Sequence, residues 1–267
     1  MRWENLPVPH FVDAVEKCQG VGIVPIGVIE AHGSHLPLGT DMFESHWTAC
    51  RAAEREPALV FPAYPYGINH ESAHLPGAIV FKRELVFALL ENVCDEMARH
   101  GVKKIILLSG HGGNRYFLPL FVQTLLEEDR DYCVYYATPK AEGTEGVLET
   151  GETGHACEAE TSTSLYINGE LVQMDEVPAE PFSSLRRNAE LKEAGAYSPM
   201  DWYAMYPRMY VGDASKATAE KGQQLNEARV EGLVRIIRAV KNDEVTEGLI
   251  DEFVGGIEEP SNPWQDA

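Results

Sequence analysis

The feature that most constrains the fold is a repeated pattern: an apolar run, a glycine-containing loop and a helical segment. Residues 21–29 form an apolar run rich in β-branched side chains, a loop follows over 30–40, and 41–54 has helical character. Residues 103–108 form the clearest strand, which leads through the glycine loop 110–113 into a helical segment over 116–128. Such alternation is typical of a largely parallel sheet with helices on both faces. We therefore predict an α/β fold, with further strands over 59–61 and 132–136.

Other helices are predicted where apolar residues recur at helical spacing. Leu85, Leu89, Val93 and Met97 define one over 83–100, which Gly101 should end. Helices are also expected over 155–167 and 218–241, whereas 142–154 and 170–215 should be irregular. The aromatic residues clustered over 197–210 are expected in the core or at a subunit interface. No repeat or linker divides the 267 residues, so we expect one domain over 1–267 with a polar tail over 258–267.

The charge balance excludes some classes of function. The chain has 42 acidic and 22 basic residues, a formal net charge of −20. Such a surface repels phosphate backbones and anionic lipid, which disfavours nucleic-acid and membrane partners. No run approaches the ~20 apolar residues of a membrane helix, and the N-terminus lacks the apolar core of a signal peptide. The five cysteines form no Cys-x-x-Cys pair, which is typical of reduced thiols and a cytoplasmic location.

Four stretches of the sequence concentrate metal-ligating side chains, and each lies where a predicted strand ends or a helix begins. The candidate residues are Glu30, His32, Asp41, His111, His155 and Glu160. Carboxylate and imidazole donors suit a zinc- or manganese-type divalent ion. Binding sites of parallel α/β sheets form outside the carboxyl ends of the strands, where several of these residues should meet. The sequence therefore predicts a hydrolytic metal centre.

The spacing of these residues suggests separate roles. Glu30 and His32 are two apart, so their side chains would share one face of an extended strand end. Asp41, at a helix start, offers a carboxylate that could bridge two ions, although it could equally be an acid that favours the helix dipole. Two ions ~3.5–4 Å apart can hold a hydroxide and polarise a carbonyl. His155 is the candidate for passing a proton to the leaving nitrogen, a role worth ~10²–10⁴ in rate.

Several motifs, in order from about residue 20 to 240, resemble the creatininase family. They are Pro25-Ile26-Gly27-Val28-Ile29-Glu30-Ala31-His32-Gly33, Leu36-Pro37-Leu38-Gly39-Thr40-Asp41, Gly110-His111-Gly112-Gly113-Asn114, His155 with Glu160-Thr161-Ser162, His74-Leu75-Pro76-Gly77, and Gly212-Asp213-Ala214-Ser215-Lys216-Ala217-Thr218. The resemblance implies a three-layer α/β/α sandwich, commonly a hexamer, that hydrolyses non-peptide C–N bonds at a two-metal site. By position, Glu30 and His111 would hold one ion and His32 the other, Asp41 would bridge them, and His155 would be the catalytic histidine.

Two departures separate this chain from creatininase proper. Creatininase has a metal-ligating glutamate two residues after the histidine of its third motif, where this chain has Gly113. Glu160 is the best-placed carboxylate to replace it. Creatininase also closes tryptophans over its substrate from the segment before the catalytic histidine, but this chain has no tryptophan between Trp47 and Trp202. Creatinine itself is therefore not the expected substrate, whereas formamides, cyclic amides and peptides remain open.

We expect a metal-dependent amidohydrolase that cleaves a non-peptide C–N bond in a small cyclic amide or formamide. Hydroxide held by two divalent ions per subunit would attack the carbonyl, with His155 as general acid or base. Zinc is the first expectation for the metal, with manganese and iron as alternatives, and a homo-oligomer is expected from the resemblance. Two other functions remain open: a two-metal phosphoesterase, and a binding protein whose ions only brace its loops and whose metal sites would be closed.

Overall fold

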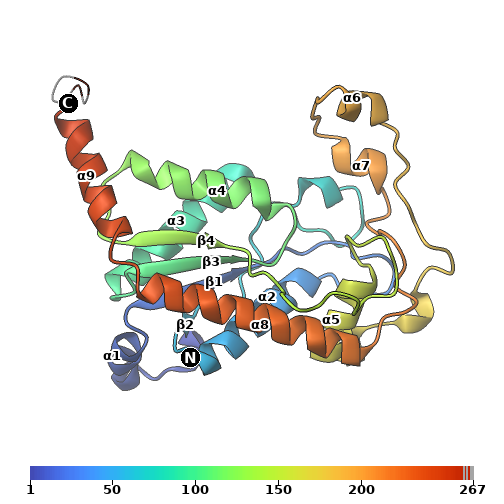
Figure 1. Cartoon of the computed structure of the whole chain (residues 1–267), viewed down its shortest axis with the longest axis horizontal. Coiled ribbons are helices and arrows are strands. Elements are labelled where there is room, and N and C mark those ends of the chain that lie inside the picture. The colour runs from blue at the N-terminus through green and yellow to red at the C-terminus, as the bar shows by residue number, and fades with distance from the viewer. Residues whose placement is uncertain (261, 263, 265–267) are drawn as a thin grey trace.

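The centre of the protein is a four-stranded parallel sheet with the strand order β2-β1-β3-β4 (Figure 1). The structure, a computed structural model, describes residues 1–260, 262 and 264. Its strands are β1 (Val21–Ile26), β2 (Leu59–Val60), β3 (Lys104–Ser109) and β4 (Cys133–Ala137). In the two central strands Val21 pairs with Lys104 and Ile26 pairs with Ser109. The loops that follow β1 and β3 therefore leave the sheet side by side at its carboxyl edge.

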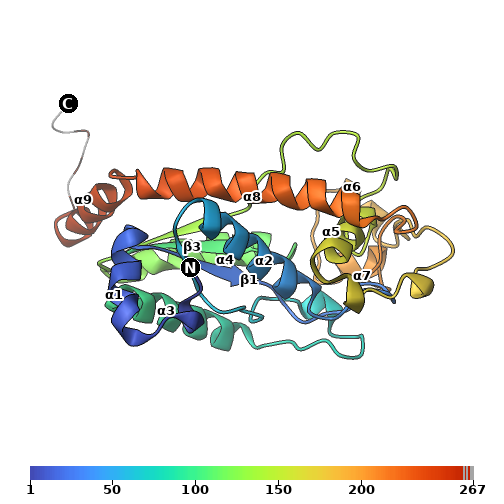
Figure 2. The same cartoon turned by 90° about the horizontal axis from the view of Figure 1, so that it is seen from below.

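Helices cover both faces of the sheet, so the molecule is a three-layer α/β/α sandwich, as predicted. The helices are α1 (Val8–Lys17), α2 (Thr40–Arg55), α3 (Arg83–Arg99), α4 (Asn114–Thr124), α5 (Glu158–Asn168), α6 (Ala189–Glu193), α7 (Asp201–Met205), α8 (Ala219–Lys241) and α9 (Thr246–Glu258). One face of the sheet packs against α2 and α8, and the opposite face packs against α1, α3 and α4. Figure 2 shows α8 above the sheet and α3 below it.

The alternation of side chains along the strands produces two hydrophobic cores. On β3, Ile105 and Leu107 pack with α3 and α4, whereas Ile106 and Leu108 pack with α2 and α8. Successive side chains of a strand point to opposite faces, and all four are buried. A central parallel strand is covered on both sides and is therefore apolar throughout. This is the physical reason that 103–108 was the clearest strand in the sequence.

Most predicted elements are present, but three details were wrong. The strand expected over 21–29 ends at Ile26. The helix expected over 155–167 begins only at Glu158, because Ala156 adopts a left-handed backbone with φ of 55°. In α3 three of the four residues predicted to face the core are each one position before the residue that is buried.

Along α3 Met97 is buried as predicted. The other buried residues are Val86, Leu90, Cys94 and Ala98, whereas Leu85 and Leu89 are exposed. The sequence analysis also assigned no helix to α1 or α9, and it treated 170–215, which contains α6 and α7, as irregular.

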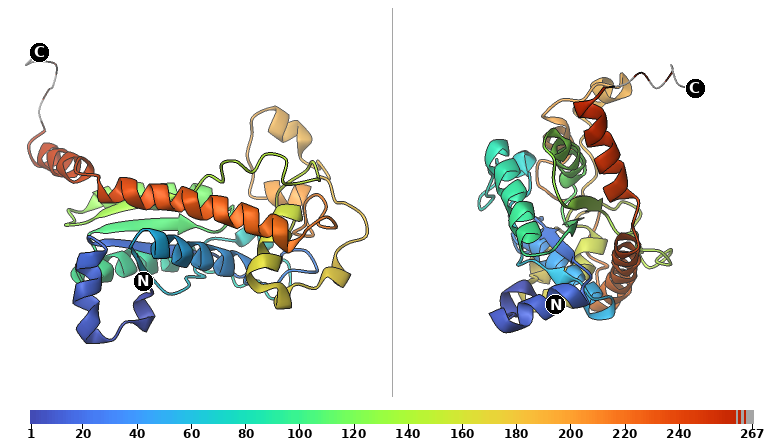
Figure 3. Two further views of the ribbon diagram at one scale, coloured as in Figure 1. Left: turned by 60° about the horizontal axis from the view of Figure 1, so that its bottom comes forward. Right: turned by 90° about the vertical axis from the view of Figure 1, so that its left-hand side faces the viewer.

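The C-terminal helix α9 projects away from the sheet (Figure 3). It ends at Glu258, where the predicted polar tail begins. Residues 261, 263 and 265–267 of that tail lie outside the described part of the chain. None of the helices in the described residues is long and apolar enough to cross a membrane.

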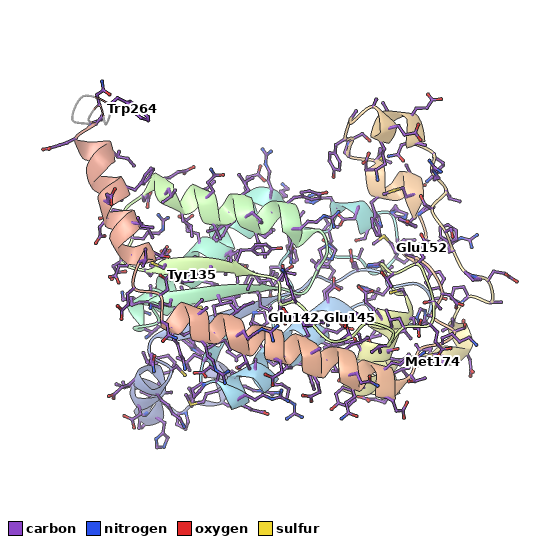
Figure 4. The ribbon with its side chains drawn as sticks, viewed as in Figure 1. Tyr135, Glu142, Glu145, Glu152, Met174 and Trp264 are labelled. Atoms are coloured by element: carbon purple, nitrogen blue, oxygen red, sulfur yellow. The ribbon has the colours of Figure 1, made fainter. Side chains whose placement is uncertain are left out.

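Two long segments, the residues leading up to α5 and residues 177–212, are joined at the end of the molecule that carries α6 and α7. Within the second segment, Phe182 and Gly212 exchange backbone hydrogen bonds of 2.8 Å each, and the first segment is attached through Glu152. Glu152 accepts hydrogen bonds from Ser183 Oγ at 2.8 Å and from Tyr206 Oη at 3.1 Å. Figure 4 labels Glu152 at this end of the molecule. Together the two segments form an irregular cover beyond the carboxyl edge of the sheet.

Candidate metal centre

Close backbone contacts position the candidate ligands at the carboxyl edge of the sheet. Asp41 lies in the first turn of α2, which approaches the ends of β1 and β3. A Cβ atom at Gly27 would lie 2.4 Å from the Met42 backbone nitrogen, and one at Gly110 would lie 2.7 Å from the Asp41 carbonyl oxygen. Any other residue at either position would push α2 away from the sheet. The glycines beside the ligands therefore place Asp41 between the two strand ends.

Asp41 lies between two buried imidazoles and directs one oxygen to each. Its Oδ1 is 3.1 Å from His32 Nε2, and its Oδ2 is 2.9 Å from His111 Nδ1. The same Nδ1 of His111 is 3.2 Å from Glu30 Oε1. Glu30 and His32 reach the cluster from the loop after β1, and His111 reaches it from the loop after β3. The structure thus brings together four of the candidate residues, with Asp41 in the middle.

Glu160 completes the cluster on the His32 side. Ligand atoms of His32, Asp41 and Glu160 all lie within 4.8 Å of one another. The left-handed backbone of Ala156 directs its N–H to Glu160 Oε2 at 2.5 Å, which fixes that carboxylate in the first turn of α5. Glu160 therefore lies on the His32 side of the cluster, and its role as a replacement for the glutamate missing at Gly113 stays a prediction.

His155 lies against the cluster, and one of its ring nitrogens is hydrogen-bonded to the backbone. Its Nε2 is 2.7 Å from the Ala31 carbonyl oxygen, and the ring stacks on His32 with centroids 4.0 Å apart. A carbonyl oxygen can only accept, so Nε2 carries the hydrogen and Nδ1 keeps its lone pair. Burial and the neighbouring His32 lower the pKa of His155 to about 4. The ring is therefore neutral near pH 7, with Nδ1 free to accept a proton.

The donor set fits divalent cations. Both side-chain oxygens of Glu30 and Oδ2 of Asp41 are buried and make no well-aligned hydrogen bond among the described residues, although His111 Nδ1 lies 3.2 Å from Glu30 Oε1 and 2.9 Å from Asp41 Oδ2. Burial alone would lower the pKa of His32, but Asp41, Glu160 and Glu30 together raise it to about 10. Burial likewise disfavours a charged His111, yet the surrounding carboxylates raise its pKa well above the ordinary value. Buried carboxylates that raise the pKa of neighbouring imidazoles form a site where metal ions can replace the imidazole protons.

Two residues near the cluster were missed by the sequence analysis. Glu71 lies in the 3₁₀ turn His70–Ser72, and its Oε1 is 3.3 Å from His111 Nε2. Trp202 of α7 packs edge-on against His155, with ring centroids 5.9 Å apart. The family-like His74-Leu75-Pro76-Gly77 segment, which begins three residues after Glu71, was a signal for the first. The second belongs to the aromatic cluster over 197–210, which was expected in the core or at an interface. His74 itself lies outside the cluster, where it hydrogen-bonds the Pro207 carbonyl at 2.7 Å.

A cavity of about 1240 Å³ opens onto the cluster. Its lining includes Glu30, Asp41 and His111, together with aromatic and thioether side chains such as Tyr116, Tyr197, Met200 and Trp202. The expectation that the aromatic residues of 197–210 belong to the core or an interface was therefore incomplete, because Tyr197 and Trp202 face this cavity.

The arrangement has counterparts among known proteins. The family model described as creatininase, creatinine amidohydrolase, matches residues 4–237. The chain belongs to the creatininase family. A creatinine amidohydrolase from Pseudomonas putida is 25% identical over 81% of this chain and 88% of its own length. A mycofactocin precursor peptide peptidase from Mycolicibacterium smegmatis is 28% identical over 83% of this chain and 85% of its own.

Among solved structures, a provisionally assigned creatinine amidohydrolase from Bacteroides fragilis is similar, with a TM-score of 0.75 and 30% identity over 85% of this chain and 91% of that one. Family membership together with the buried ligand cluster indicates a hydrolase of amide bonds with a candidate metal site.

Proposed function

We propose that this creatininase-family protein is a metal-dependent amidohydrolase that cleaves a non-peptide C–N bond in a small cyclic amide or formamide. The observation that carries the proposal is the buried Asp41 carboxylate, which directs one oxygen to His32 and the other to His111. Glu30 and His111 would hold one ion, and His32 and Glu160 the second, with Asp41 shared between them. Solved creatininases that are 23–24% identical to this chain include a Zn-Zn form and a Mn form. We therefore propose two divalent ions, zinc first and manganese or iron as alternatives.

Two bound ions would activate water and polarise the amide carbonyl. His155 holds its Nε2–H on the Ala31 carbonyl, which orients the ring and leaves Nδ1 to take up a proton and pass it to the leaving nitrogen. The lowered pKa keeps this ring neutral near pH 7, so Nδ1 presents a lone pair and not an N–H. Such proton transfer contributes ~10²–10⁴ in rate. Trp202 packs on His155 and shields it from bulk water.

A peptide amide is the second candidate substrate, and the size of the cavity favours it. The volume of about 1240 Å³ exceeds the roughly 300–1,000 Å³ that usually encloses a drug-sized ligand. The similar protein from Mycolicibacterium smegmatis is named as a peptidase of a precursor peptide. A substrate larger than a single small ring would use the apolar wall formed by Tyr116, Tyr197 and Met200.

A substrate screen tests the proposal. The protein is loaded with zinc or manganese and offered formamides, cyclic amides, short peptides and phosphate monoesters, with the metal-free protein and Asp41→Ala as controls. We expect metal-dependent release of amine or ring-opened product from an amide in the panel. Turnover of phosphate esters alone would instead support a phosphoesterase. Full metal loading without turnover of any compound would support a metal-braced binding protein.

We also propose that the chain acts as a single domain in a cytoplasmic homo-oligomer. The five cysteines are all free and buried, which suits a reducing compartment. Leu85 and Leu89 on α3 and Leu249 and Phe253 on α9 expose apolar surface that a second copy could cover. Light scattering after size-exclusion chromatography measures the assembly, and a monomer at micromolar concentration would contradict this part of the proposal.

A further inference from the structure

Glu71 approaches the candidate metal centre from a turn that contributes none of the expected ligands. The turn His70–Ser72 lies between β2 and α3. It is anchored on the β1 loop, because the buried Asn69 donates to the Ile29 carbonyl at 3.0 Å and Ser72 Oγ donates to the Asn69 carbonyl at 2.9 Å. These two bonds fix the turn next to Glu30. The Glu71 side chain, 24% exposed, points from it to His111.

His111 has a carboxylate on each side of its ring. Its Nδ1 faces Glu30 and Asp41 at 3.2 and 2.9 Å, and its Nε2 lies 3.3 Å from Glu71 Oε1. Nε2 has no well-aligned hydrogen bond among the described residues, so the Glu71 carboxylate is the ion-pair partner within its reach. If an ion is bound by Nδ1 together with Glu30 and Asp41, the remaining ring hydrogen must be on Nε2, directed at Glu71.

Gly113 makes this contact sterically feasible. A Cβ atom at position 113 would lie 2.5 Å from His111 Nε2 and 2.8 Å from Glu71 Oε1. Any side chain there would enter the space between the imidazole and the carboxylate. A glutamate at position 113, as in creatininase proper, would therefore occupy the space in which Glu71 contacts His111.

We propose that Glu71 is a positioning residue that accepts the Nε2–H of His111 and so directs the Nδ1 lone pair to the ion held with Glu30 and Asp41. A metal-ligating histidine commonly gives its second ring N–H to a carboxylate or carbonyl, which fixes the tautomer and orientation of the ring, and loss of such a partner typically weakens metal binding ~10–100-fold. The inference rests on the proposed function only in requiring an ion at His111.

Competition titration with a chromophoric chelator measures the zinc affinity of metal-free wild type, Glu71→Ala, Glu71→Gln and the control Glu84→Gln, an exposed glutamate paired with Arg83. We expect Glu71→Ala to keep two ions but to bind one of them ~10–100-fold more weakly. Glu71→Gln should lose less, because its amide oxygen still accepts the ring hydrogen, and Glu84→Gln should match wild type. In a His111→Ala background Glu71→Ala should have no further effect, since coupled residues are not additive.

Three results would overturn the proposal. The first is a Glu71→Ala affinity within twofold of wild type. The second is an equal loss with and without His111, which would mean that Glu71 acts through general structure. The third is a Glu71→Gln protein that holds only one ion, which would make Glu71 a ligand itself. All three leave the amidohydrolase proposal intact, whereas a wild-type protein that binds no ion at all removes both.

Discussion

Replacing Asp41 by alanine should weaken both metal ions, whereas replacing Glu160 should weaken only one. Asp41 Oδ1 lies 3.1 Å from His32 and Oδ2 lies 2.9 Å from His111, so this one side chain serves both halves of the cluster. Glu160 lies within 4.8 Å of His32 and Asp41 ligand atoms, on one half alone. The two variants remove the same kind of group from the same cluster and therefore form a matched pair.

The magnitude follows from the number of donors. Each proposed ion has three protein donors, and Asp41 supplies one of the three in both cases. Removing one partner of a buried charged contact costs ~2–5 kcal/mol. At ~1.4 kcal/mol per factor of ten, Asp41→Ala should lower the affinity for each ion ~30-fold to several thousandfold. Glu160→Ala should produce a loss of this size for a single ion.

Metal content after dialysis, measured by mass spectrometry, should be two ions per subunit in wild type, none in Asp41→Ala and one in Glu160→Ala. Isothermal titration of the metal-free proteins then gives the individual affinities. Full occupancy in Asp41→Ala would refute the shared carboxylate. Two retained ions in Glu160→Ala would show that another residue replaces the ligand missing at Gly113.

Three further predictions concern the histidines and the packing of α5. His155→Ala should keep both ions but reduce turnover ~10²–10⁴-fold, and loss of metal would make His155 a ligand. The pKa of His32 is raised from 6.5 to about 10 in the metal-free protein, so the stability it contributes is complete below pH 6.5 and is lost as pH rises through about 10. Because an ion must displace the proton on His32, metal affinity should rise by up to ~10-fold per pH unit between pH 6.5 and about 10. Metal titrations at several pH values measure this rise, and an affinity that does not change with pH would contradict it. A Cβ atom at Gly222 would lie 1.8 Å from the Ser162 carbonyl oxygen, where α8 crosses α5. Gly222→Ala should therefore lower the free energy of unfolding by ~1–3 kcal/mol and reduce the melting temperature. The control is Gly248→Ala on α9, where an added Cβ meets nothing within 4 Å, and it should leave the melting temperature unchanged.

The sequence predicted the two central strands well because they are buried on both faces. Such strands are apolar at every position, as in Ile105–Leu108, and cannot be mistaken for exposed loops. It was less successful where the pattern is ambiguous. On α3 the side chains of Leu85 and Val86 are equally apolar, and only packing against β3 decides that Val86 is buried and Leu85 exposed.

The candidate site shows the same division. Glu30, His32, Asp41 and His111 could be found because they follow the ends of strands or begin a helix, and the edge of a parallel sheet brings such positions together. Glu71 and Trp202 were not identified as site residues, because they come from a short turn and a short helix whose positions no periodic pattern predicts. Their places depend on long-range contacts, such as Asn69 with the Ile29 carbonyl and Phe182 with Gly212.

By itself the sequence determined that this chain forms a parallel α/β sheet and that carboxylates and imidazoles follow its strands, because hydrophobic periodicity and local glycine chemistry are properties of neighbouring residues. Only the tertiary structure decided which nitrogen of His111 faces Asp41 and which faces Glu71, and that His155 commits Nε2 to the Ala31 carbonyl. Those orientations depend on atoms that are tens of residues apart in the chain, and they meet only when the packed layers fix the loops between them.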